Sequence, residues 1–140
     1  MPGATRIALR VALAVLALSL AALVLSWRAD DRACEDAGRE VFLSARDGGA
    51  PLEAALRDVR ARCRGGDRLV AAAGALTQAG RLREASAAAR EAVERAPEDF
   101  RAWVALSIAL ADSDPAGAAS ARRQALELNP LAAPDRRGAQ

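Results

Sequence analysis

The chain has 140 residues, of which 20 are basic and 18 acidic, giving a formal net charge of +2. So small a net charge excludes a protein that binds nucleic acid through a clustered basic field. The composition is 52% hydrophobic but only 3% aromatic. It favours helices, because Ala and Leu are good helix formers and strands draw on aromatic and β-branched residues. We therefore expect an all-α protein with one small domain and an additional segment.

The first element in the chain is a long apolar run. Residues 7–27 carry a single charge, that of Arg10, and end at Trp27. A helix of this length is about 31 Å long, close to the roughly 30 Å hydrocarbon core of a bilayer. Tryptophan is also enriched where a membrane meets water. We expect a transmembrane helix over residues 7–27, preceded by a short tail over residues 1–6.

Charge around this run predicts its orientation. Arg6 and Arg10 lie at its N-terminal side, whereas the arginines that follow it are offset by Asp30 and Asp31. The positive-inside rule then keeps the N-terminus in the cytoplasm and exports the rest. We expect a single-pass protein of the bacterial cytoplasmic (inner) membrane with a periplasmic soluble domain. The alternative is a signal peptide cleaved after Ser26, although the length of the run favours an uncleaved signal anchor.

Residues 28–65 are predicted to form a helical hairpin with one cysteine in each arm. Gly48 and Gly49 form the turn, and Cys34 and Cys63 lie at equal distances from it. Residues equidistant from the turn of an antiparallel hairpin lie side by side, so an exported pair is expected to oxidise to a disulfide. The alternative is two buried free thiols that act as small hydrophobic side chains.

The helix ends of this hairpin follow from capping rules. We expect Asp30 or Asp31 to cap the first helix, which then runs to about Ala45. Pro51 suits the first position of the second helix, which is expected to stop at Gly65-Gly66.

A repeated pattern follows the hairpin. Pro97 and Pro130 each close a helical run and lie 33 residues apart, and Leu69 and Trp103 lie 34 residues apart. A period in this range is that of a helix-turn-helix repeat. We expect one repeat over residues 66–99 and a second over residues 100–131. The small and large apolar positions of the first repeat are Leu69, Ala73, Leu76, Leu82, Ala85, Ala89 and Ala92. Those of the second are Trp103, Leu106, Ser107, Leu110, Ala118 and Ala125.

This pattern, with its closing Ala125-Leu126-Glu127-Leu128-Asn129-Pro130, resembles the tetratricopeptide repeat (TPR) family. The resemblance covers about half of the chain and implies a short all-α solenoid. Such repeats bury their apolar faces only by stacking, and about three are needed, so the hairpin over 28–65 is expected to act as a third unit. The alternative is an alanine-rich helical bundle without repeats. Residues 132–140 are expected to form a flexible tail.

The resemblance also implies where a partner would bind. TPR arrays hold extended peptides or helices in a groove lined by the first helix of each repeat. The corresponding positions are Asp67, Val70, Gly74, Gln78, Arg101, Val104, Ile108 and Asp112. Arg101 would fix a carboxylate of the partner, and Val104 and Ile108 would bury one of its side chains.

No arrangement of residues indicates catalysis. The chain has no histidine, and its glycine pairs are isolated, so we predict no catalytic, metal or cofactor site. The expected function is that of an adaptor or assembly factor that binds a protein partner, with self-association through the last repeat as a further expectation. The alternative is a structural subunit of a larger membrane complex that packs through its transmembrane helix.

Overall fold

The computed structural model describes the backbone of residues 2–132 and the side chains of residues 10 and 12–131. All but one residue of the tail expected over 132–140 lies outside this range. The described residues form six α-helices and one 3-10 helix, with no strand among them. The chain divides into two compact units, Met1–Ala33 and Cys34–Gln140. The expected all-α class is confirmed.

Helix α1 (Pro2–Ser44) begins in the first unit and ends in the second. Among the described residues, one helix is long and apolar enough to cross a membrane: the part of α1 over Ala12–Ser44 contains an 18-residue window with a mean hydropathy of 1.9. Asp30 and Asp31 lie inside α1, so the expectation that one of them caps a new helix was wrong. Neither Gly nor Pro occurs between Ala4 and Ala37, and nothing in that stretch forces a helix to end.

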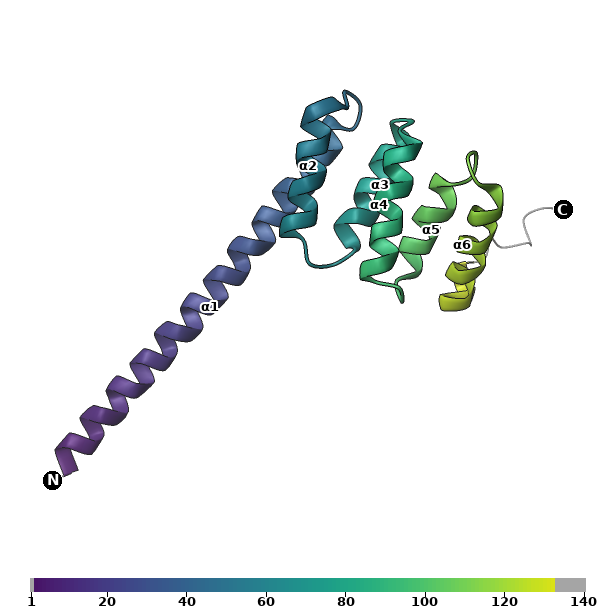
Figure 1. The fold of residues 1–140 in the computed structure, drawn as a ribbon. Coiled ribbons are helices and arrows are strands. Elements are labelled where there is room, and N and C mark those ends of the chain that lie inside the picture. Colours follow the sequence, from purple (N-terminus) through teal and green to yellow (C-terminus); the bar gives the residue numbers. More distant parts are fainter. Residues whose placement is uncertain (1, 133–140) are drawn as a thin grey trace. The chain divides into compact units, whose positions relative to one another are not determined.

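The second unit consists of three helical hairpins, as expected (Figure 1). After the end of α1 come α2 (Gly49–Arg62), α3 (Asp67–Gln78), α4 (Leu82–Arg95), α5 (Phe100–Ala109), α6 (Pro115–Leu128) and the 3-10 helix Pro130–Ala132. Helices α3 and α4 pack together, as do α5 and α6, and α5 packs against both α3 and α4. Figure 1 shows α3 to α6 side by side in chain order.

The turn of the first hairpin requires glycine. Gly48 and Gly49 have φ angles of 67° and 66°, in the left-handed region that side chains disfavour. At the other end of the hairpin, Cys34 and Cys63 form the predicted disulfide, with their Cα atoms 5.0 Å apart. Pro51 is the third residue of α2 rather than the first. Its missing N–H still costs nothing, because the first four N–H groups of a helix have no partner within it.

One correction concerns the end of a helix. Helix α2 ends at Arg62, before the predicted glycines, because Cys63 already has an extended backbone. The Asp114 side chain accepts a hydrogen bond from the Gly117 N–H at 2.9 Å, and Pro115 occupies the first turn of α6. Asp114 and Pro115 therefore define the start of α6.

Alanine dominates the core of the second unit. The largest fully buried side chains are those of Leu52, Leu69, Leu76, Val41 and Val59. The core also contains four completely buried alanines from α4: Ala85, Ala88, Ala89 and Ala92. Side chains this small let neighbouring helices approach closely, and at such positions there is no room for a larger group.

Arginine side chains attach the first hairpin to the second. The Arg81 Nε donates to the backbone oxygen of Ala45 at 2.8 Å. The Arg95 Nη1 donates to the backbone oxygen of Cys63 at 2.6 Å. Both oxygens belong to the ends of helices, where carbonyl groups lack a partner within the helix. The two arginines therefore satisfy the ends of both arms of the first hairpin.

Candidate protein-binding surface

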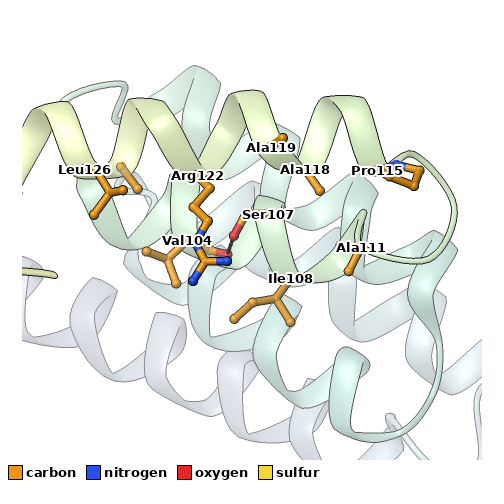
Figure 2. A pocket seen from close by; sticks show the side chains of 10 residues that line it. Val104, Ser107, Ile108, Ala111, Pro115, Ala118, Ala119, Arg122 and Leu126 are labelled. Carbon is orange, nitrogen blue, oxygen red and sulfur yellow. Dashed lines mark hydrogen bonds between the residues drawn. The ribbon is translucent and has the colours of Figure 1, made fainter. Parts of the chain in front are cut away.

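A pocket of about 560 Å³ lies between α5 and α6, in the last hairpin (Figure 2). Its walls are almost entirely apolar or small side chains, with one charged exception, Arg122. The lining residues are Val104, Ser107, Ile108, Ala111, Pro115, Ala118, Ala119, Arg122, Ala125 and Leu126. The Ser107 hydroxyl is already used, because it donates to the backbone oxygen of Val104 at 2.8 Å. A ligand would thus meet an apolar surface and a single cation.

The eight residues of the expected groove lie on neighbouring elements. Asp67, Val70, Gly74 and Gln78 belong to α3; Arg101, Val104 and Ile108 belong to α5; and Asp112 lies in the turn before α6. Since α3 contacts α5, the structure brings the two helices of this groove together. We call Val70, Gly74, Gln78, Val104 and Ile108 the α3–α5 face. Each of its residues is at least partly exposed, and Val104 and Ile108 also line the pocket.

Arg101 is engaged within the protein itself. Its Nη2 lies 2.7 Å from Asp67 Oδ1 and 2.8 Å from Asp99 Oδ2. The Arg101–Asp67 pair joins α5 to α3, and both partners come from the set expected to form the groove. A carboxylate from a binding partner would have to compete with two carboxylates that already neutralise this guanidinium.

Asp99 also caps α5, since its Oδ1 accepts the Arg101 N–H at 3.0 Å. The hydrogen bond from the Arg101 side chain, supported by the backbone N–H and by the guanidinium charge, lowers the pKa of Asp99 below its ordinary value of 3.8, although partial burial opposes this. The ionised form is therefore the one that the folded protein stabilises.

Because the pKa of Asp99 is lowered in the folded protein, the free energy of unfolding depends on pH. A carboxyl group whose folded pKa is depressed adds stability above its unfolded pKa, and loses it as the pH falls through the folded value. The variant Asp99→Asn keeps an oxygen for the cap but has no charge to lose. We expect the wild type to lose more unfolding free energy than Asp99→Asn between pH 5 and pH 2. Urea titrations of both chains across this range measure the difference, and parallel pH profiles would contradict it.

Arg122 is the residue of this surface that sequence reasoning missed. Figure 2 shows its side chain reaching from α6 towards Val104 and Ser107 on α5. No hydrogen bond or ion pair joins it to another residue in the part of the chain that the structure describes. A signal was present in the sequence: one repeat earlier, the corresponding position is Ala89, so an arginine stands where the pattern has a small residue.

Comparison of this chain with protein families, with curated proteins and with solved structures found no match.

Proposed function

We propose that this chain is a membrane-anchored, TPR-like protein–protein interaction module, acting as an adaptor or assembly factor on the outer side of the bacterial cytoplasmic membrane. Three features support this proposal. The repeat spacing is that of the TPR family, the second unit is built from three hairpins, and α1 carries an apolar stretch long enough to span a bilayer. The arginines before that stretch favour an exported second unit.

The observation that carries the proposal is the α3–α5 face, whose residues are all at least partly exposed in the described part of the chain. Gly74 lies at its centre, and a Cβ atom added there would meet nothing within 4 Å. Ile108 is 54% exposed, which is unusual for so large an apolar side chain in a protein whose core is mostly alanine. A strip of small and apolar residues on two adjacent helices fits an extended or helical segment of another protein.

A specific observation also supports a second candidate, a structural subunit of a larger membrane complex. The large apolar side chains of α1 between Leu13 and Trp27 are exposed, as a surface that faces lipid or other membrane helices would be. In this case the protein acts through the packing of its apolar stretch in the membrane complex, and the second unit has no binding role of its own. Exchanging residues 7–27 for an unrelated membrane anchor separates the two candidates, because an adaptor keeps its activity and a membrane subunit loses it.

Photo-crosslinking in the native host tests the adaptor directly. A photoreactive amino acid at Gln78, an exposed residue of the α3–α5 face that does not line the pocket, is expected to capture an exported protein. The variant Gly74→Arg should abolish this capture, because its side chain fills the strip. The substitution should raise the stability of the second unit by about 0.5–1 kcal/mol, since arginine is a far better helix former than glycine.

Gly65→Arg is the matched control for this experiment. A Cβ atom at Gly65 also meets nothing within 4 Å, but this glycine lies in the loop between α2 and α3, outside the face. Capture that survives at Gly65→Arg and disappears at Gly74→Arg supports the adaptor. No capture from Gln78, together with membrane proteins caught by a probe at Leu18, would favour the structural subunit instead.

A further inference from the structure

Large apolar side chains are exposed at two places in the described part of the second unit. Phe42 and Leu43, on the first hairpin, are 65% and 61% exposed. Ile108, Leu128 and Leu131 are exposed on the last hairpin or just after it. The middle hairpin, α3 and α4, has no exposed large hydrophobic residue. Among the described residues of the second unit, exposed large apolar side chains therefore gather on the first and the last hairpin.

The middle hairpin shows what fills a pocket of this kind. Helix α5 packs against both α3 and α4. Ala73, Ala85 and Ala89 of that hairpin are all at most 1% exposed. One repeat later, the same positions are Ser107, Ala118 and Arg122, which line the pocket. The pocket is thus the counterpart of the place where α5 sits on the preceding hairpin, and its natural occupant is another helix.

The direction of that helix follows from the short turns. Consecutive helices joined by short connections run antiparallel, so α3 and α5 run the same way, as does the end of α1 in the first hairpin. A helix seated in the pocket as α5 is seated on α3 and α4 would also run this way. The end of α1 runs in the same direction as α3 and α5. The end of α1 from another copy can therefore fill this position while both copies keep the same orientation.

Charge supports the same occupant. Arg122 has no partner among the described residues, and the same is true of the carboxylate of Glu40. Glu40 and Leu43 are three positions apart on α1, so they lie next to each other on the helix surface. The nearby Arg39 is occupied by Asp36 at 3.7 Å. Within the described part of the chain, the first hairpin therefore presents an acid without a partner beside the exposed Leu43 side chain, and the last hairpin presents a base without a partner beside an apolar pocket.

We propose that this protein associates head to tail with itself: the exposed side of α1 around Glu40 and Leu43 of one copy occupies the α5–α6 pocket of the next, with Glu40 against Arg122. This contact joins two different surfaces, so it continues from copy to copy until a ring closes or a copy is blocked. It goes beyond the adaptor function, because Gln78 and Gly74 of the α3–α5 face do not line the pocket. Either proposal can therefore fail while the other stands.

Blocking one surface at a time tests the proposal. The full chain in detergent micelles is examined by mass photometry over a range of concentrations, with the expectation of species larger than a dimer. Leu43→Glu destroys the inserted surface and Ile108→Glu destroys the pocket, and each variant alone should be monomeric. An equimolar mixture of the two should form dimers and nothing larger, because one intact surface remains on each chain. Dimers in the mixture also show that both variants are folded.

Exchanging the charges tests the contact itself. Arg122→Glu and Glu40→Arg are each expected to weaken association at least tenfold, and the double variant to restore it, as close interfacial charge pairs do. Arg123→Glu is the matched control, since Arg123 is exposed on the same helix but does not line the pocket. A monomeric wild type, oligomers that survive both Leu43→Glu and Ile108→Glu, or a mixture without dimers would each overturn the proposal.

Discussion

Replacing both Cys34 and Cys63 by serine is expected to lower the free energy of unfolding of the second unit by about 3.6 kcal/mol. The bond joins residues 29 positions apart, and removing it returns the entropy of that loop to the unfolded chain. Urea denaturation, followed by the fluorescence of Trp103 in chains that also carry Trp27→Phe, measures the loss. Reduction of the wild type by dithiothreitol should give the same loss and leave the double variant unchanged.

The loss should be concentrated in the first hairpin. In a stacked array each unit contacts only its neighbours, so a weakened terminal unit opens before the rest. Amide hydrogen exchange is therefore expected to accelerate most in α2 and least in α4 and α5. Equal urea midpoints for the oxidised and serine chains would contradict the predicted contribution, and uniform acceleration along the second unit would contradict its location.

Ala89→Arg is expected to cost about 3–5 kcal/mol, and this is the second large effect. Ala89 is completely buried in α4, so a guanidinium there has no room and would be an unpaired charge in the core. The substitution gives the middle hairpin the residue that the last hairpin has at Arg122. We expect a lower urea midpoint and the loss of the packing of α5 on α3 and α4.

The reciprocal change, Arg122→Ala, is the matched control. Arg122 is exposed and has no partner among the described residues, so its removal should change the unfolding free energy by less than about 0.5 kcal/mol. The same two residue types exchanged at equivalent positions thus give very different results. Near-equal costs for Ala89→Arg and Arg122→Ala would mean that the pocket is not the counterpart of the site filled by α5.

The hairpins and the disulfide were predictable because local chemistry determines them. Gly48 and Gly49 can adopt the left-handed backbone of a tight turn, and two cysteines equally far from that turn must meet. Asp114 and Pro115 likewise mark the start of a helix by themselves. Asp30 and Asp31 did not obey the same rule. A cap forms only where the helix is broken, and nothing breaks α1 there.

The contacts of the surface side chains were harder to predict from the sequence. Counting repeat positions places Arg101 in the groove, but it says nothing of Asp99, whose carboxylate holds the same guanidinium. That pair depends on the backbone path of the turn before α5. Arg122 was missed for a different reason: an arginine on a helix is ordinarily a solvated residue, and only the volume between α5 and α6 distinguishes this one.

The bonds from Arg81 and Arg95 have a consequence for how freely the first hairpin can change. Both arginines donate to main-chain oxygens, those of Ala45 and Cys63. Every amino acid supplies such an oxygen, so side chains near the two helix ends can be exchanged without losing either bond. The side chains on which these two hydrogen bonds depend therefore belong to the neighbouring hairpin and not to the first one. Divergence or redesign of residues 45–62 is restricted mainly by their own packing, and a different stapled hairpin of the same length could be joined to the same two arginines.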